Sequence, residues 1–241
     1  MASSPVVPRI YVLAGANGAG KSSVAGAAFL QQGAEYFNPD EATQRILSAN
    51  AGFSLAEANS AAWNEGRRLL ERAIDEKLNF AFETTLGGKT ITALLEKALS
   101  QGIEVRIWFV GLKDEDLHIR RVRSRVEHGG HDIPEERIRQ RYTASRINLI
   151  RLLPKLTELM LYDNSAEADP ETGVTPTPLL IIHLEGGKIS ACCDAILVPE
   201  WAKPIVAAAL KLEGSRSPSS FYYLSLSTSE SRIMMWHPRR S

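Results

Sequence analysis

A glycine-rich turn near the start of the chain constrains its fold more than any other feature. The sequence "GANGAGKSS" at residues 15–23 follows directly on the apolar run "RIYVLA" at residues 9–14, and it contains the pattern G-x-x-x-x-G-K-[ST]. Glycines at these positions let the backbone fold around phosphate groups so that several N–H groups point inward. A strand that enters such a turn therefore predicts a nucleotide-binding loop. Its residues are Gly15, Ala16, Asn17, Gly18, Ala19, Gly20, Lys21, Ser22 and Ser23.

Two residues of this loop have side chains with expected roles of their own. Lys21 is expected to reach the β- and γ-phosphates of the nucleotide, and the Ser22 hydroxyl is expected to ligate Mg²⁺. The helix that begins at the loop adds the positive end of its dipole. We therefore expect ATP or GTP as the bound nucleotide, with Mg²⁺ as its metal.

Short apolar runs alternate with longer amphipathic segments up to residue 163. Strands are expected at residues 9–14, 34–38, 79–84, 104–112 and 158–163. Helices are expected at residues 21–32, 40–50, 54–77, 89–101, 113–127 and 134–155. The strands are nearly continuous in apolar residues, which is typical of strands covered by helices on both faces. The alternation predicts an α/β fold, the three-layer sandwich of P-loop NTPases, with a parallel sheet of about five strands.

The remaining segments set the expected domain limits. The run "LLIIHLEGGKISA" predicts a C-terminal β-hairpin turned at Gly186 and Gly187, and a short helix follows it. We expect one kinase domain at residues 9–213, after an N-terminal extension at residues 1–8. The serine-rich tail at residues 214–241 has no sustained period and is expected to be disordered.

The charge balance gives no electrostatic argument for nucleic acid or an anionic membrane surface as a partner. Lys+Arg and Asp+Glu both number 28, so the formal net charge is zero. No apolar run approaches the roughly 20 residues that cross a bilayer, and the N-terminus lacks the apolar core of a signal peptide. The two cysteines, Cys192 and Cys193, are adjacent and suit a reducing compartment. We expect a soluble, cytoplasmic protein.

Acidic residues follow the second and third expected strands, where ligands bind in a sheet of this kind. Asp40, in "NPDEATQRI", could accept the proton of an acceptor hydroxyl, or it could cap the following helix. Glu83 ends the apolar run "NFAFE", where a charge is costly unless it meets a cation or a polar ligand. We expect Glu83 to hold hydroxyls of the acceptor or a Mg²⁺-bound water, and capping of the following helix or pairing with an arginine is the alternative. Thr84 and Thr85 add hydroxyls with weaker claims.

An arginine-only stretch lies between residues 120 and 151, which contain no lysine. Its members are Arg120, Arg121, Arg123, Arg125, Arg137, Arg139, Arg141, Arg146 and Arg151. Guanidinium groups suit bidentate phosphate contacts, and the turn "HGGHDIP" splits the stretch into two basic helices. We expect a lid at residues 117–142 that closes over the γ-phosphate. The candidates for phosphate contact are Arg121, Arg125, Arg139 and Arg141.

The alternative for most of these arginines is a solvated helix face with partners such as Glu135 for Arg139. The stretch also lacks the interleaved aromatic residues that stack on bases, so we do not expect nucleic acid as a partner. His128 and His131 have no third ligand at a suitable spacing, so hydrogen bonding is expected of them rather than metal ligation.

Several of these stretches together resemble the zeta toxin family of P-loop kinases. They are "ANGAGKSS", "FNPDEATQRI", "FETTLGG", "VRIWFVGL", "RVRSRVEHGGHDIPEERIRQRY" and "LYDNS", and the resemblance covers roughly residues 9–205. The resemblance implies transfer of the γ-phosphate of ATP or GTP to a sugar hydroxyl, with UDP-N-acetylglucosamine as the acceptor class. It makes Asp40 the general base, Glu83 and Thr84 acceptor-binding residues, and Lys21 and Ser22 the phosphate and Mg²⁺ positions. Lid arginines would be Arg121 or Arg125, and Arg139 or Arg141.

Two other functions stay open at this point. The acceptor could be another metabolite, a nucleoside or a nucleic-acid 5′-hydroxyl. The protein could also be a nucleotide-dependent switch that transfers nothing. An antitoxin partner cannot be read from the sequence.

Overall fold

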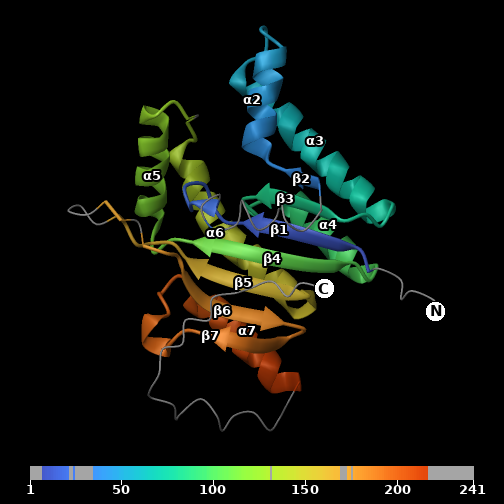
Figure 1. Ribbon diagram of the computed structural model, residues 1–241, viewed down its shortest axis with the longest axis vertical. Helices are drawn as coiled ribbons and strands as arrows, with labels where there is room; N and C mark the ends of the chain where they lie inside the picture. The colour runs from blue at the N-terminus through green and yellow to red at the C-terminus, as the bar shows by residue number, and fades with distance from the viewer. Residues whose placement is uncertain are drawn as a thin grey trace.

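A central β-sheet organises the computed structural model, which describes residues 7–21, 24, 35–130, 132–168, 173–174 and 176–216. Within these residues the sheet has seven strands in the order β2-β3-β1-β4-β5-β6-β7 (Figure 1). Their bounds are Arg9–Ala14 (β1), Glu35–Phe37 (β2), Phe80–Thr84 (β3), Glu104–Gly111 (β4), Glu158–Asp163 (β5), Leu179–Glu185 (β6) and Lys188–Cys192 (β7). Strands β1 to β5 pair in parallel, as the alternation of strands and helices predicts.

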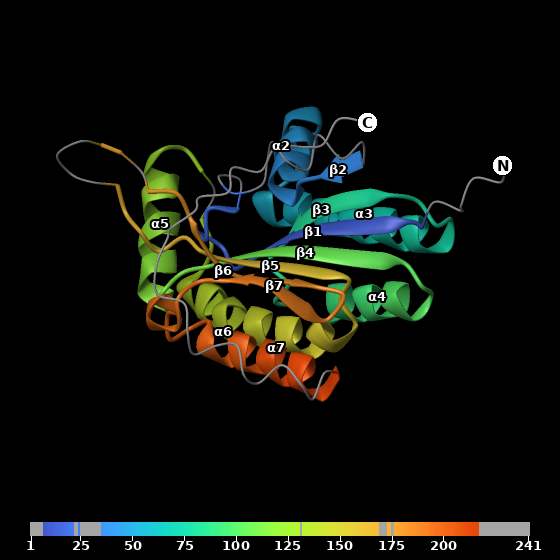
Figure 2. The same cartoon turned by 60° about the horizontal axis from the view of Figure 1, so that its bottom comes forward.

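Helices pack against one face of this sheet and enclose the main core. The described helices are Pro39–Ala49 (α2), Leu55–Asp75 (α3), Lys89–Ser100 (α4), Glu115–Glu127 (α5), Glu135–Leu152 (α6) and Lys203–Arg216 (α7). Apolar side chains of α3, α4, α6 and α7 join those of the strands in one cluster, and Figure 2 shows α4, α6 and α7 beneath the sheet. Tyr11 and Leu13 face the other side, where they cluster with Val24. The predicted helix at residues 21–32 lies largely outside the described residues.

The helix starts follow local sequence rules. Ser54 accepts from the backbone of Glu57 while the Glu57 carboxylate accepts from the backbone of Ser54, which confirms the capping box that this spacing predicts. Asn38 caps α2 and Asp114 caps α5 through their side-chain oxygens. Each cap satisfies backbone N–H groups that the first helical turn leaves without a partner.

The predicted C-terminal hairpin is present and extends the central sheet. β6 pairs antiparallel with β5, and β7 pairs antiparallel with β6. Ile181, Ile182 and Leu184 of β6 are fully buried in the main core. Burying these side chains requires β6 to continue the sheet, where α7 covers it (Figure 2).

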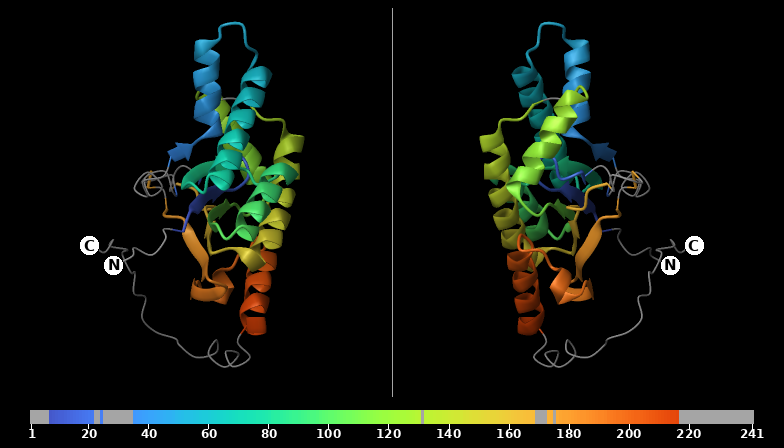
Figure 3. Two further views of the ribbon diagram at one scale, coloured as in Figure 1. Left: turned by 90° about the vertical axis from the view of Figure 1, so that its right-hand side faces the viewer. Right: turned by 90° about the vertical axis from the view of Figure 1, so that its left-hand side faces the viewer.

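Two helical units extend beyond the sheet and define where a ligand can sit. Helices α2 and α3 pack against each other as an antiparallel pair above β2 and β3, and Figure 3 shows this pair from both sides. Helix α5 rises on the other side of the loop that follows β1 (Figure 1). Helix α7 runs to Arg216, three residues past the predicted end of the domain at residue 213. The rest of the predicted tail and residues 1–6 lie outside the described residues.

None of the described helices is both long enough and apolar enough to traverse a lipid bilayer.

Candidate active site

The loop after β1 has the backbone geometry of a phosphate-binding turn. Gly15 and Gly18 have positive φ angles of 143° and 80°. A Cβ atom on Gly15 would lie 2.2 Å from the carbonyl oxygen of Val110, and one on Gly18 would lie 2.6 Å from that of His118. Only glycine fits both positions, because conformation and space exclude a side chain. Ser22 and Ser23, the last two residues predicted for this loop, lie outside the described residues.

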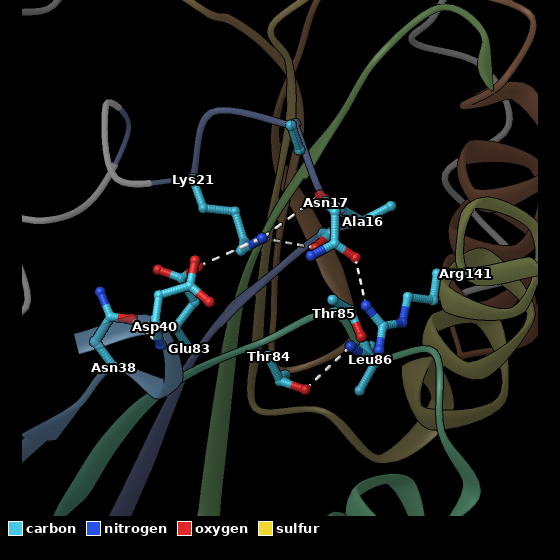
Figure 4. Close-up of polar contacts among 12 residues, drawn as sticks. Ala16, Asn17, Lys21, Asn38, Asp40, Glu83, Thr84, Thr85, Leu86 and Arg141 are labelled. Atoms are coloured by element: carbon cyan, nitrogen blue, oxygen red, sulfur yellow. Dashed lines mark hydrogen bonds and ion pairs between the residues drawn. The ribbon is translucent and has the colours of Figure 1, made fainter. Parts of the chain in front are cut away.

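Lys21 is buried at the end of this loop and points back toward it (Figure 4). Its Nζ donates to the carbonyl oxygen of Gly15 at 3.0 Å and lies 3.4 Å from Oε1 of Glu83. Tyr36 donates its O–H to the other carboxylate oxygen of Glu83 at 3.3 Å. Burial, followed by the charge of Glu83, raises the pKa of Tyr36, so this phenol stays neutral and can donate. The buried charge of Glu83 is thus balanced by a cation and a hydrogen bond.

Asp40 lies in the first turn of α2 without serving as its cap. The backbone N–H of Asp40 donates to Oδ1 of Asn38 at 2.9 Å, so Asn38 takes the capping role (Figure 4). The Asp40 carboxylate is about half exposed in the cavity, and Nη1 of Arg125 lies 3.5 Å from its Oδ2. The carboxylate is therefore in contact with an arginine of α5 while it remains accessible from the cavity.

The two threonines after Glu83 shape the turn that follows β3. Oγ1 of Thr84 accepts from the backbone N–H of Leu86 at 3.1 Å, and Oγ1 of Thr85 accepts from that of Gly87 at 3.4 Å. Both hydroxyls line the cavity. In both bonds the hydroxyl oxygen is the acceptor, so neither bond uses the hydroxyl proton, which could be donated to a ligand.

The predicted lid arginines fall into two groups. Arg121, Arg125 and Arg141 line the cavity. Arg121 donates to the carbonyl oxygen of Ala166 at 3.0 Å, and Arg141 donates to Oδ1 of Asn17 in the phosphate-binding loop at 2.7 Å (Figure 4). Burial lowers the pKa of both Arg121 and Arg141. These groups are cations held partly out of water, where they attract phosphate more strongly than at a surface.

Arg139 does not lie with the other three. It bridges α6 to α5 through Glu115 and Asp116, each at 2.9 Å, and it is absent from the described cavity lining. Glu135, considered above as its partner, pairs with Arg123 instead. Arg137 lines the cavity, although the sequence did not single it out.

Of the two histidines in the predicted lid turn, His128 forms a hydrogen bond through Nδ1 to the carbonyl oxygen of Ser124 at 2.7 Å, at the C-terminal end of α5. His131 lies outside the described residues.

One cavity of about 1690 Å³ brings these groups together. Single small-molecule pockets usually measure about 300–1,000 Å³, so this cavity has room for two ligands side by side. Its walls come from the phosphate-binding loop, α2, α3, the turn after β3, α5, α6 and the segment after β5. Asn164 of that last segment is buried and donates to the carbonyl oxygen of Ala19 at 2.9 Å, which ties the segment to the loop.

His118 supports the loop from below and was not expected from the sequence. Its side chain is 1% exposed, and Nδ1 lies 2.7 Å from the carbonyl oxygen of Asn17, so the ring carries its proton on Nδ1 and donates it. Burial lowers the pKa of His118 from 6.5 to about 4. Lys21 and Arg121 act in the same direction, whereas Asn17 and Asp114 oppose them. In the folded protein, the His118 imidazole that supports the loop is therefore neutral at pH 7.

The lowered pKa predicts a specific acid sensitivity of the fold. The unfolded chain binds a proton at His118 below pH 6.5, but the folded protein does so only near pH 4. Stability from this group is thus complete above pH 6.5 and is lost as the pH falls, by about 2 kcal/mol at pH 5. In denaturant titrations at pH 7 and pH 5, His118→Asn should reduce the pH dependence of the unfolding free energy by about that amount. The exposed His128→Asn variant serves as the control, and an unchanged slope in His118→Asn would contradict the prediction.

The fold and the cavity together define a nucleotide-binding P-loop protein of the kinase-like class. The mainly parallel sheet, the glycine-rich loop after β1 and the arginines of α5 and α6 that line the same cavity are the features that place it there. A model of the zeta toxin family matches residues 2–167, and the chain belongs to this family.

Several known proteins and solved structures are similar to this chain. An uncharacterized protein of Haemophilus influenzae is 29% identical over 133 residues, which are 53% of this chain and 88% of the relative. Two crystal structures of the AvrRxo1-ORF1:AvrRxo1-ORF2 complex, one with sulphate ions and one with ATP, contain a chain that matches with a TM-score of 0.57 at 17% identity. The matches cover 85% and 94% of this chain, and 64% and 67% of the other.

A third similar structure comes from the PezAT chromosomal toxin-antitoxin system of Streptococcus pneumoniae. It matches with a TM-score of 0.51 at 15% identity, over 89% of this chain and 88% of that one. At these identities the structural matches establish the shared fold.

Proposed function

We propose that this protein is an ATP- or GTP-dependent kinase that transfers the γ-phosphate to a hydroxyl group of a small molecule, specifically of a nucleotide sugar such as UDP-N-acetylglucosamine. The observation that carries the proposal is the shared cavity. Lys21, Asp40 and the arginines of the lid line one space with room for a nucleotide and a second ligand. A protein that only sensed its nucleotide would have no need of the second volume.

The reaction would follow the in-line course of phosphoryl transfer. Asp40 would orient the acceptor hydroxyl and take its proton as the oxygen bonds to the γ-phosphorus, while the bond to the β-phosphate oxygen breaks and the nucleoside diphosphate leaves. Lys21 would exchange its contact with Glu83 for the phosphates. Glu83, thereby released, would join Thr84 in holding acceptor hydroxyls.

The lid would supply the remaining positive charge. Arg121, Arg125 and Arg141 face the cavity, and we add Arg137 to this set because it lines the same wall. Closure of this lid would neutralise charge that develops on the γ-phosphoryl oxygens and would exclude water, which is the competing acceptor.

The residues present suit Mg²⁺ bound together with a nucleotide. Mg²⁺ prefers oxygen ligands and retains several waters, so it needs one or two protein groups beside the phosphate oxygens. The described part of the chain holds no cluster of three or more metal-binding side chains. Ser22 would be its protein ligand. Mg²⁺ would supply positive charge to the transferred phosphate.

The acceptor is tested by product analysis. The protein is incubated with Mg²⁺ and ATP or GTP, together with nucleotide sugars, nucleosides or an oligonucleotide with a free 5′-hydroxyl, and products are identified by mass spectrometry. A nucleotide sugar that gains one phosphate would support the proposal. Phosphorylation of another compound alone would replace the acceptor, and nucleotide hydrolysis without any phosphorylated product would refute the kinase.

The two groups of arginines predict different consequences of substitution. Arg141→Ala removes a partly buried cation that touches the phosphate-binding loop, so kcat/KM for the nucleotide should fall by about 10²-fold or more. Arg139→Ala removes an exposed bridge between α5 and α6, so turnover should change little and only a small loss of thermal stability is expected. Steady-state kinetics and thermal unfolding of both variants check this. Equal losses of turnover would contradict the assignment.

PezAT is a toxin-antitoxin system, and by extension we propose an antitoxin-like protein partner for this kinase. The adjacent free thiols of Cys192 and Cys193 favour a reducing cytoplasm as its location.

A further inference from the structure

Helix α3 presents one continuous face to the cavity. The proposed phosphoryl-transfer mechanism assigns no role to any residue of this face. The lining residues of this helix recur at three- and four-residue spacing, as one helical face does. They are Leu55, Ala56, Asn59, Ser60, Trp63, Gly66 and Arg67. At 1.5 Å per residue this stripe is about 18 Å long, which is comparable to an extended nucleotide.

The centre of the stripe is an aromatic ring left open to the cavity. Trp63 is 47% exposed, unlike the tryptophan of the core, Trp201, which is 3% exposed. The guanidinium carbon of Arg67 lies over the Trp63 ring at 5.9 Å from its centroid. Glu71 holds that guanidinium from the next turn at 2.6 Å. An indole braced in this way offers a flat, electron-rich surface at little entropic cost.

The stripe lies on the acceptor side of the phosphate-binding loop. The loop follows β1 in the middle of the sheet, α2 and α3 stand above β2 and β3, and α5 rises on the other side of the loop (Figure 1). Helix α2, which carries Asp40, is joined to α3 by a hydrogen bond between Thr43 and Asn59 at 3.1 Å. A ligand on the stripe would therefore share the Asp40 side of the cavity.

We propose that Trp63, braced by Arg67, is a stacking subsite that binds a planar heteroaromatic ring of the acceptor and so sets acceptor specificity. Asn59 and Ser60, one turn away on the same face, offer an amide and a hydroxyl to the ring edge. This inference rests on the proposed function, because it assigns the second ligand of the same cavity. It selects acceptors that carry a base-like ring over free sugars or sugar phosphates.

The test is a binding measurement that needs no turnover. The full chain is saturated with Mg²⁺ and a non-hydrolysable ATP analogue, so that the donor position is filled. Calorimetry then measures binding of UMP, CMP, AMP and GMP against ribose 5-phosphate, which lacks the ring. We expect at least one nucleotide to bind about 10-fold more tightly than ribose 5-phosphate, as stacking on an aromatic side chain provides.

Matched variants identify the residues responsible. Trp63→Ala should abolish the preference for the ring, while Trp63→Phe should retain most of it. Phe53→Ala is the control, because Phe53 is a similarly exposed aromatic side chain (44%) next to the same helix and lies outside the cavity lining. Arg67→Ala is compared with Arg72→Ala, whose i,i+4 pair with Glu76 lies on the exposed surface of α3. Arg67→Ala should weaken the preference, and Arg72→Ala should not.

The outcomes separate this inference from the kinase itself. Equal binding of nucleotides and ribose 5-phosphate, or a ring preference that survives Trp63→Ala, would overturn the stacking subsite, whatever the transfer assay shows. A ring preference lost in Trp63→Ala would support the subsite even where no phosphoryl transfer is found, in which case only the proposed function fails.

Discussion

Replacement of Lys21 by methionine should lower kcat/KM for ATP by about 10³-fold or more. Lys21 is the one buried ammonium group aimed into the described part of the cavity, and the phosphates that it would contact carry most of the charge of the transition state. Methionine keeps the apolar stem of the side chain and removes the charge, so the loss is not caused by an empty space in the loop. Initial rates and the affinity for a fluorescent ATP analogue are the measurements.

The control for this variant is another lysine with a carboxylate partner. Lys97 on α4 pairs with Asp75 at the surface, and Lys97→Met should leave turnover unchanged. Since Lys21→Met also leaves Glu83 without its cation, thermal unfolding must show that the variant is folded at the assay temperature. A folded Lys21→Met protein with normal turnover would contradict the role of the loop.

Replacement of Asp40 by asparagine should have the second large effect, and of a different kind. The loss of a general base lowers kcat by about 10²–10⁴-fold, whereas nucleotide affinity should stay within a few-fold of the original, because Lys21 and the loop are untouched. Asparagine retains the size of the side chain and an oxygen for Arg125. Turnover of acceptor and nucleotide binding are measured on the same preparation.

This variant also separates transfer from switching. In a nucleotide-dependent switch, Asp40→Asn would bind nucleotide and retain its biological effect, and only Lys21→Met would lose it. Asp116→Asn is the control, since Asp116 is an exposed carboxylate that pairs with Arg139 outside the cavity. Full phosphoryl transfer by the Asp40→Asn protein would contradict the assignment of the base.

The order of strands and helices was largely predictable, because it depends on local patterns. Continuous apolar runs such as "NFAFE" and "VRIWFVG" became the interior strands β3 and β4 of the sheet. The position of the hairpin was not predictable in this way. Whether β6 joins the sheet depends on the open edge of β5 and on cover from α7, and both are distant in sequence.

The same limit applies to the lid. Arg137, Arg139 and Arg141 alternate along α6, and successive residues are rotated by about 100° around a helix, so Arg139 must face away from a surface that Arg137 and Arg141 share. The sequence contains this relationship but not the rotation of the helix relative to the cavity. Contacts with Glu115 and Asp116 on α5 fix that rotation.

Residues whose role depends on where the fold places them were the hardest to identify from the sequence. Asp40 and Asn38 are both good helix caps, and only the structure distinguishes the cap from the exposed carboxylate. His118 and Trp63 lie on ordinary amphipathic helices, where a histidine or a tryptophan carries no local signature. Their significance arises because the fold brings one beneath the loop and the other into the cavity.

The most direct test of the central claim is the fate of the γ-phosphate. The protein is incubated with Mg²⁺ and ATP labelled in its γ-phosphate, together with a small-molecule extract of cells or with UDP-N-acetylglucosamine, and labelled products are separated by chromatography. We expect the label to enter an organic phosphate ester, and this product should disappear with Lys21→Met and with Asp40→Asn. Label that remains in ATP, or that appears only as inorganic phosphate under every condition, would contradict the account.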